Sequence, residues 1–324
     1  MNTAASLADA IGRHDRRALA QAITLVESGL KEHQSQAREL LAALPAPAQP
    51  ALRIGITGPP GAGKSTFIET LGGHLIDRGH SVAVLTVDPS SVVSGGSILG
   101  DKTRMPTLSA NEKAFVRPSP SSGTEGGVGR FTREAIAVCE AAGFDRVIVE
   151  TVGVGQSELR AASMTDVFVL LLVPGSGDEL QGIKRGVMEL ADLILVNKAD
   201  GQLAQTANRT VSEYAAATGF LQARTADWKV PVLAMSALKD IGVVDVLEQM
   251  EKFFVHVTKS SGLLSSRRES QASEALMQAL HEGLLDKFLR NEKNADEVER
   301  VRRKVAMGQL TPGLAARALI DQFT

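Results

Sequence analysis

The chain has 324 residues, of which 44% are hydrophobic and 22% charged, and its 35 basic and 37 acidic side chains leave a formal net charge of −2. This composition is that of an ordinary globular protein, so general disorder and a fibrous repeat are excluded, and the length predicts about two domains or one large domain with extensions. Because the charges nearly balance, we expect neither nucleic acid nor a membrane surface as a partner.

The sequence also favours a protein of the cytoplasm. Its single cysteine, Cys139, cannot form an internal disulfide, which fits a reducing compartment. The longest wholly apolar run, Val167–Val173, is far shorter than the roughly 20 residues that a membrane-spanning helix needs. Near the N-terminus, Asp9 and Asp15 and the lack of an apolar core argue against a signal or transit peptide.

The first zone, residues 1–50, is predicted to be a helical extension. Apolar side chains recur in steps of three and four along residues 16–44, at Leu19, Ile23, Val26 and Leu30. This spacing places them on one face of an amphipathic helix. Asp15 is positioned to cap its start, and the Pro/Ala-rich stretch 44–50 to end it. We expect this helix to pack on its own domain.

Residues 51–258 alternate short β-rich runs with helical stretches. The runs are continuously apolar, as expected for strands that are buried on both faces of a parallel sheet, and the helical stretches supply the crossovers. The predicted strands are Arg53–Thr57, Val82–Asp88, Arg146–Val152, Val167–Val173, Leu193–Asn197 and Val230–Met235. The prediction is an α/β fold with a doubly wound, mostly parallel sheet.

The last zone, residues 259–324, is predicted to be a second helical extension. One helix is marked by Leu276, Leu280, Leu284 and Phe288, a second by Val298, Val301 and Val305, and a short third runs from Gly313 to Phe323. Three small helices bury little apolar surface by themselves. We therefore expect them to pack on the α/β domain or on another subunit.

A phosphate-binding loop follows the first predicted strand. The stretch GPPGAGKS matches G-x-x-x-x-G-K-[ST] at every fixed position and precedes a predicted helix. Its glycines let backbone N–H groups turn toward a phosphate, and the helix start adds its positive dipole end. Lys64 is predicted to reach the β- and γ-phosphates, and Ser65 to bind Mg²⁺. The nucleotide-binding residues predicted here are Gly58, Pro59, Pro60, Gly61, Ala62, Gly63, Lys64, Ser65 and Thr66.

Three acidic residues are candidates to join Ser65 in the magnesium site and Lys64 in catalysis. Asp88 and Glu150 lie on predicted strands whose carboxyl ends face the ligand crevice. Burying an acid on an apolar strand costs free energy, which favours a functional role for both. Asp101 follows a Gly/Ser-rich loop, where simple solvation is an equally good explanation. The predicted metal ligands are thus Ser65, Asp88, Asp101 and Glu150, and the predicted catalytic residues are Lys64, Asp88, Asp101 and Glu150.

Two loops predict guanine selectivity. Residues 197–200, Asn-Lys-Ala-Asp, follow a predicted strand and match the N-K-x-D motif of guanine-nucleotide proteins. The carboxylate of Asp200 can accept from N1–H and the exocyclic amine of guanine, whereas adenine presents an acceptor at N1. The stem of Lys198 can lie along the base, and Asn197 can tie this loop to the phosphate site.

The second guanine loop is predicted after the last strand. Ser236, Ala237 and Leu238 resemble it, with the Ala237 backbone N–H directed at O6 of the base. Together with the phosphate loop, the two motifs predict binding of GTP and GDP.

Three further loops are predicted to respond to the nucleotide or to a partner. Glu150 opens a stretch that resembles the γ-phosphate-sensing loop, in which the Gly153 N–H contacts the last phosphate. Gln156 either orients water or is simply solvated. Residues 88–104 are rich in Gly and Ser, as expected of a segment that reorders with the nucleotide. Residues 174–184 are either read by a partner, through Gln181 and Lys184, or form an ordinary connection.

The stretches GPPGAGKST, VDPSS…SGGSILGDKTRM, VETVGVGQSE and NKAD resemble the methylmalonyl-CoA mutase-associated GTPases, the MeaB, ArgK and MMAA family. The resemblance covers essentially the whole chain. It implies a homodimeric, Mg²⁺-dependent P-loop GTPase that is joined through its C-terminal helices. It also implies a chaperone of adenosylcobalamin-dependent methylmalonyl-CoA mutase, which gates cofactor loading and protects or reactivates the mutase, with an adenosyltransferase as a further candidate partner. Hydrolysis is expected to be slow until the mutase accelerates it.

Other functions stay open at this point. A metal-insertion GTPase needs clustered thiolates or imidazoles, whereas the six histidines are scattered and Cys139 has no predicted histidine neighbour. A small-molecule kinase would use the same phosphate loop, but the N-K-A-D motif opposes it. A scaffold that merely retains the phosphate loop is a third alternative.

Overall fold

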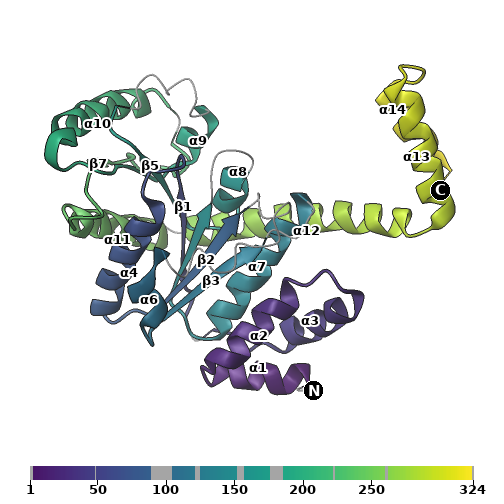
Figure 1. The fold of residues 1–324 in the computed structure, drawn as a ribbon, viewed down its shortest axis with the longest axis horizontal. Helices are drawn as coiled ribbons and strands as arrows, with labels where there is room; N and C mark the ends of the chain where they lie inside the picture. Colours follow the sequence, from purple (N-terminus) through teal and green to yellow (C-terminus); the bar gives the residue numbers. More distant parts are fainter. Residues whose placement is uncertain are drawn as a thin grey trace. The chain divides into compact units, whose positions relative to one another are not determined.

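The computed structural model describes residues 3–47, 49–88, 104–120, 125–151, 157–175, 185–221, 223–259 and 262–322. Figure 1 shows the elements, coloured along the chain. The chain divides into two compact units, Met1–Glu269 and Ser270–Thr324. The predicted division into residues 1–50, 51–258 and 259–324 stays a prediction. Of the helices that the structure describes, none combines the length and the apolar character that crossing a membrane requires.

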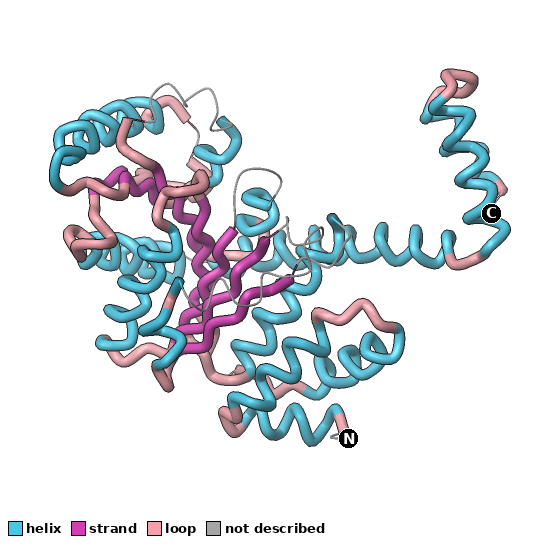
Figure 2. The backbone as a smooth tube through the Cα atoms, in the orientation of Figure 1, coloured by secondary structure: helices cyan, strands magenta, loops and turns pink. Residues whose placement is uncertain are grey.

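A seven-stranded sheet forms the centre of the first unit (Figure 2). Its strands are β1 (Leu52–Thr57), β2 (Val82–Asp88), β3 (Ala114–Pro120), β4 (Arg146–Thr151), β5 (Val167–Leu172), β6 (Leu193–Val196) and β7 (Val232–Ala234). All pairings are parallel, in the order β3-β2-β4-β1-β5-β6-β7. Because the chain adds strands first on one side of β1 and then on the other, the sheet is doubly wound, as predicted. The ligand crevice of such a sheet lies beyond the carboxyl ends of its central strands.

Helices cover both faces of this sheet. On one face lie α4 (Lys64–Asp77), α6 (Pro106–Ala110) and α11 (Val243–Lys259), whose core includes Phe67, Leu71 and Phe253. The other face is covered by α1 (Ala4–Gly12), α2 (Arg16–Val26), α3 (Lys31–Ala43), α7 (Glu125–Ala141), α8 (Ser157–Ala162), α9 (Arg185–Leu190) and α10 (Ala204–Thr218). Alternate residues of β5 enter the two cores, Val169 on one side and Leu170 on the other. This explains the continuously apolar strands.

Two expectations about the elements were wrong. The single helix expected over residues 16–44 is divided into α2 and α3, and α1 precedes them. The predicted cap is confirmed, since the Asp15 side chain accepts from the backbone N–H groups of Arg17 and Ala18. The strand β3 was not expected at all. It contains two prolines and Arg117 and lies at the edge of the sheet, where prolines are tolerated.

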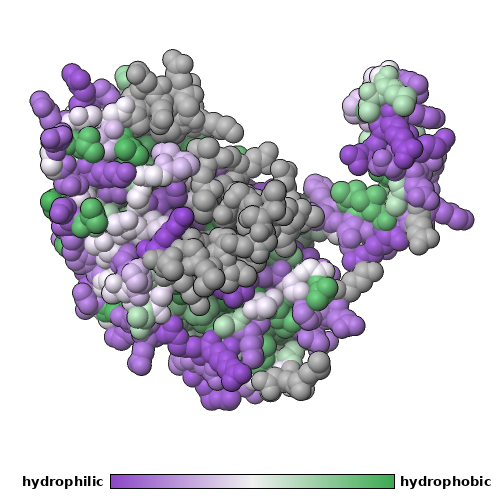
Figure 3. Space-filling model, in the orientation of Figure 1, coloured by the Kyte–Doolittle hydropathy of each residue, from purple (hydrophilic) through white to green (hydrophobic). Residues whose placement is uncertain are grey.

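The second unit consists of helical segments that match the predicted ones. They are α12 (Leu263–Leu289), which begins in the first unit, α13 (Glu292–Ala306) and α14 (Pro312–Asp321). Figure 3 shows hydrophobic side chains at the surface of this unit. Its exposed large apolar residues are Leu276, Met277, Leu280, Leu284, Leu285, Leu289, Met307, Leu310, Leu314 and Ile320.

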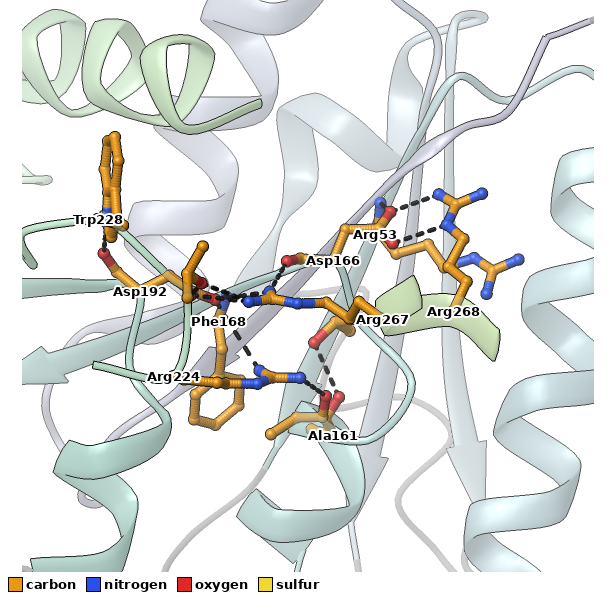
Figure 4. A network of polar contacts seen from close by, with 12 residues as sticks. Arg53, Ala161, Asp166, Phe168, Asp192, Arg224, Trp228, Arg267 and Arg268 are labelled. Atoms are coloured by element: carbon orange, nitrogen blue, oxygen red, sulfur yellow. Dashed lines mark hydrogen bonds and ion pairs between the residues drawn. The ribbon is translucent and has the colours of Figure 1, made fainter. Parts of the chain in front are cut away.

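Buried charges are paired at the amino edge of the sheet, within the first unit (Figure 4). Asp166 precedes β5 and accepts from the Arg53 N–H at 2.9 Å and from Arg268 Nε at 2.8 Å. Asp192 precedes β6 and accepts from the Phe168 N–H at 2.9 Å and from Arg267. Both carboxylates are at most 1% exposed. The two arginines lie at the start of α12, so the network fixes that part of the helix to the sheet.

Candidate functional site

The phosphate-binding loop connects β1 to α4 at the carboxyl edge of the sheet. Gly58, Gly61 and Gly63 have φ values of +151°, +79° and +85°. A Cβ at Gly58 would lie 2.3 Å from the Leu171 carbonyl oxygen, and one at Gly63 would lie 2.5 Å from Asn197 Nδ2. The loop therefore lies directly against β5 and the Asn197 side chain, and only glycine allows both approaches.

The Lys64 side chain folds back onto its own loop. Its Nζ donates to the carbonyl oxygens of Gly58 at 2.7 Å and Pro59 at 3.1 Å, and the residue is buried. Burial lowers the pKa of Lys64, while the carboxylates of Glu150 and Glu158 act in the opposite direction. The ammonium is therefore held by neutral carbonyl groups close to two acids.

The structure brings Ser65 and Glu150 together. Ser65 Oγ donates to Glu150 Oε1 at 3.1 Å, and Glu150 is only 4% exposed, on β4. Beside them, Thr151 Oγ1 donates to Thr57 Oγ1 at 2.8 Å, which links the ends of β4 and β1. Hydroxyl and carboxylate oxygens are ligands that Mg²⁺ accepts, although it usually keeps several waters as well. No group of three or more His, Cys, Asp or Glu suited to a metal occurs among the described residues.

Several predicted site residues cannot be placed. Asp88 is the last residue of β2, but its side chain lies outside the described part of the structure. Asp101, Gly153, Gln156, Gln181 and Lys184 also lie outside the described residues. Their predicted roles stay predictions.

Asn197 joins the two predicted guanine loops to the phosphate-binding loop. It follows β6, is 2% exposed, and donates through Nδ2 to the Ala62 carbonyl oxygen at 2.7 Å. Its Oδ1 accepts from the backbone N–H groups of Lys198 at 2.8 Å and Ala237 at 3.0 Å. The expected tie between the base loop and the phosphate loop is thus present. Lys198 is exposed with φ +60°, and Asp200 is half-buried just before a short 3₁₀ turn.

The loop after β7 is a closed turn. Ser236 and Ile241 exchange backbone hydrogen bonds of 2.9 and 3.0 Å, and Leu238 at its tip is 77% exposed. The Ala237 N–H, which we expected to point at guanine O6, donates to Asn197. A hydrogen bond from the Ala237 N–H to guanine O6 would therefore compete with its hydrogen bond to Asn197 Oδ1.

Two charged residues near Lys64 escaped the sequence analysis. Glu158 is 4% exposed near the start of α8, and Arg104 lies just after an undescribed segment. Both affect the pKa of Lys64: attraction to Glu158 raises it, and repulsion from Arg104 lowers it. Glu158 lies in the first turn of α8, where acids are common because they interact favourably with the helix dipole. Nothing in the sequence therefore indicated that this acid would be buried near Lys64.

A family model described as methylmalonyl-CoA mutase-associated GTPase MeaB matches residues 19–293. A "Probable GTPase" of Mycobacterium tuberculosis is 48% identical over 320 residues, which cover 99% of this chain and 95% of that protein. The mitochondrial methylmalonic aciduria type A homolog of Mus musculus is 45% identical over 318 residues, or 95% and 76% of the two chains. A crystal structure described as an LAO/AO transport system kinase has a TM-score of 0.79 and 37% identity, and covers 99% of this chain and 97% of its own.

Proposed function

Because this chain belongs to the MeaB family of methylmalonyl-CoA mutase-associated GTPases, we propose that it is a GTP-driven chaperone of an adenosylcobalamin-dependent methylmalonyl-CoA mutase. It gates loading of the cofactor and protects or reactivates the mutase, and it works in the cytoplasm. An adenosyltransferase that supplies the cofactor is a second partner. The observation that carries the proposal is the joining of a phosphate loop and a guanine motif by Asn197, in a chain with these relatives.

In the proposed function, the phosphate loop binds the β- and γ-phosphates through its backbone N–H groups and Lys64. The ammonium exchanges the carbonyl oxygens of Gly58 and Pro59 for charged phosphate oxygens. This exchange is favourable because a partly desolvated cation interacts more strongly with an anion than with a neutral carbonyl. Thr66 lies in the first turn of α4, whose N-terminus points its positive dipole end at the same place.

Ser65 and Glu150 would hold Mg²⁺, with Asp88 and Asp101 as further candidates. The oxygen atoms that meet at 3.1 Å in the Ser65–Glu150 contact fit this metal. When bound, Mg²⁺ neutralises charge on the phosphates during transfer. Glu150 also accepts a proton from, or orients, the attacking water, and the Gly153 N–H contacts the last phosphate.

Asp200 and the second loop select the base. The Asp200 carboxylate accepts from N1–H and the exocyclic amine, and the Lys198 stem lies along the ring. Ser236, Ala237 and Leu238 face O6 and the rim of the base. GTP and GDP then stabilise different loop arrangements, and the mutase binds one better than the other.

The test is GTP hydrolysis by the purified protein with and without a candidate mutase. We expect slow turnover alone and faster turnover with the mutase, since a partner can complete an active site that is incomplete by itself. Equal rates, with binding of the mutase shown independently, would contradict the proposal.

We also propose that the protein is a homodimer joined through its C-terminal helices. The second unit exposes many large apolar side chains, among them Leu276, Leu280 and Leu284. Exposed apolar patches of this kind commonly mark sites where proteins associate. Leu280→Asp should shift the mass measured by light scattering from dimer to monomer. A wild-type monomer would contradict the proposal.

A kinase is the second candidate function, because the solved structure at 37% identity is described as a transport system kinase. Incubation with γ-labelled GTP or ATP distinguishes the two. Label that appears only in inorganic phosphate supports the GTPase, whereas label on an acceptor molecule supports the kinase. The metal-insertion alternative gains no support from the described residues, where no clustered metal ligands occur.

A further inference from the structure

The helix that begins in the phosphate loop also contacts the second guanine loop. Thr70 Oγ1, in α4, lies 3.0 Å from the Ala237 carbonyl oxygen and 3.1 Å from the Thr66 carbonyl oxygen one turn earlier. One turn later, His74 Nε2 lies 2.8 and 3.0 Å from the two carboxylate oxygens of Asp240. Residues four apart lie on one face of a helix, so Thr70 and His74 form one contact line along the loop.

The loop that they contact is a compact turn. Ser236 and Ile241 exchange backbone hydrogen bonds, and the Lys239 N–H donates to Ser236 Oγ at 3.3 Å. Asp240 has φ +53°, and Gly242 has φ +73°, where a Cβ would lie in a tight contact of 3.0 Å with the Ala234 carbonyl oxygen. We therefore expect residues 236–241 to move together as a rigid turn, so that a contact which fixes one end of the turn also fixes the other residues.

The Ala237 residue is held on both sides. Its N–H donates to Asn197, which belongs to the first guanine loop, and its carbonyl accepts from Thr70, which belongs to α4. Because α4 starts at Lys64, the distance between the phosphate end and the base end of the site is set partly by this helix. A shift of the turn by a fraction of an ångström would misalign its N–H groups with O6 of a bound guanine.

We propose that Thr70 and His74 are positioning residues for guanine recognition. They fix the turn formed by residues 236–241 relative to the phosphate loop, so that the preference for a base that carries O6 depends on them. The inference rests on the proposed role of this turn as the second guanine loop.

The first experiment compares GDP with 2-aminopurine riboside diphosphate, which lacks O6 and also the N1–H of guanine. The loss of N1–H is common to the wild type and the variant, so the difference between the two proteins reports on O6. Affinities are measured by titration calorimetry for the wild type and for Thr70→Val, which keeps the shape and removes the hydroxyl. The variant should bind GDP about five-fold more weakly, as expected for one neutral hydrogen bond, and bind the 2-aminopurine nucleotide unchanged. Thr70→Ser should restore the preference.

Thr258→Val is the matched control. Thr258, on an exposed face of α11, donates to the Phe254 carbonyl oxygen four residues earlier, which is the same local bond that Thr70 makes within α4. Its removal should leave both affinities unchanged. The unfolding midpoints of the two valine variants, measured without nucleotide, should agree, which separates positioning from a general loss of stability.

The second experiment is a double-mutant cycle between His74→Ala and Asp240→Gly, which removes the carboxylate and suits the positive φ of this position. Their side chains are 25% and 49% exposed, so each single variant should speed GDP dissociation only about two-fold. The double variant should match the single ones, because both remove the same contact. Effects that multiply would mean that the two residues act separately, and this would overturn the role of His74.

The outcomes separate this inference from the function it rests on. A wild type that binds GDP and the 2-aminopurine nucleotide equally overturns the guanine-loop assignment and the inference with it. A second outcome would overturn the inference alone. In it, the wild type prefers GDP, but the Thr70→Val variant either keeps the whole preference or loses the same affinity for both nucleotides.

Discussion

The two edges of the central sheet bury charged groups to similar extents but partner them differently. At the amino edge, Asp166 and Asp192 each accept from an arginine and from a backbone N–H. At the carboxyl edge, the Lys64 ammonium is bound by neutral carbonyl oxygens, and Glu150 accepts from a neutral hydroxyl. The amino edge therefore pairs opposite charges through direct hydrogen bonds, whereas at the carboxyl edge the Lys64 ammonium is hydrogen-bonded to carbonyl groups that a ligand can replace.

This difference separates stability from function. A buried ion pair loses much stability when one partner is removed, because the other charge is left without compensation. A buried charge that is hydrogen-bonded only to carbonyl groups adds less to the free energy of unfolding. It adds more to the free energy of binding, because a ligand can replace those carbonyl groups. Substitutions at the amino edge should thus affect folding, and those at the carboxyl edge should affect the nucleotide.

Asp192→Ala should have the largest effect on stability. It removes the acceptor of Arg267, of the Phe168 N–H and of the Thr225 hydroxyl, so the free energy of unfolding should fall by about 3–5 kcal/mol. Chemical denaturation measures the change. A loss below ~1 kcal/mol would mean that the network at this edge contributes little.

Lys64→Ala should show the reverse pattern. The free energy of unfolding without nucleotide should change by less than about 1 kcal/mol, because burial already disfavours the charged lysine, as its lowered pKa indicates. The affinity for GTP should fall at least about 100-fold, because the phosphates lose a charge-assisted partner. If the variant instead unfolds more easily and still binds GTP, the contrast between the two edges is wrong.

Asp200→Asn tests the base end of the carboxyl edge. The affinity for GTP should fall about 10- to 100-fold, while that for xanthosine triphosphate should rise, since its C2 carbonyl suits an amide donor. Competition binding with both nucleotides measures the change. Unchanged affinity for GTP would remove Asp200 from the guanine site.

Glu150→Ala should leave nucleotide binding largely intact and lower GTP hydrolysis about 100- to 10,000-fold, the range of a positioned acid–base group. Single-turnover hydrolysis separates the two effects. An unchanged rate would show that Glu150 has no catalytic part.

The smallest effect concerns Asp145, at the amino edge. Its hydrogen bonds from His80 and the Ser81 N–H outweigh desolvation and lower its pKa. A carboxyl whose pKa is lower in the folded state stabilises the protein above its unfolded pKa of about 3.9, and this stabilisation is lost as the pH falls through the folded pKa. Because the side chain is 42% exposed, the gain should be well under 1 kcal/mol. Asp145→Asn should flatten the decline of stability below about pH 4, and an unchanged slope would contradict this.

The sequence predicted the carboxyl edge better than the amino edge, for a physical reason. Phosphate and base recognition depend on short contiguous motifs, so Lys64, Ser65 and Asn197 could be found from local spacing alone. The amino-edge network joins Arg267 to Asp192, residues far apart in the chain, and such a pair leaves no local pattern. The contact of Thr70 with Ala237 escaped the sequence analysis for the same reason.

The missed strand has a different cause. In β3 the prolines and Arg117 interrupt the apolar run, and the strand is recognisable only once β2 supplies its hydrogen-bond partner. Arg117 then pairs with Glu27, the residue after α2, at 2.7 Å, and this contact depends on the tertiary packing of the N-terminal helices.

The most direct test of the contrast between the edges is amide hydrogen exchange with and without GDP and magnesium. The account predicts slower exchange in residues 58–66, 197–200 and 236–241 when the nucleotide is bound, with no change in residues 166–168 and 192–194. Protection confined to the amino edge, or no protection of the carboxyl edge at saturating nucleotide, would contradict it.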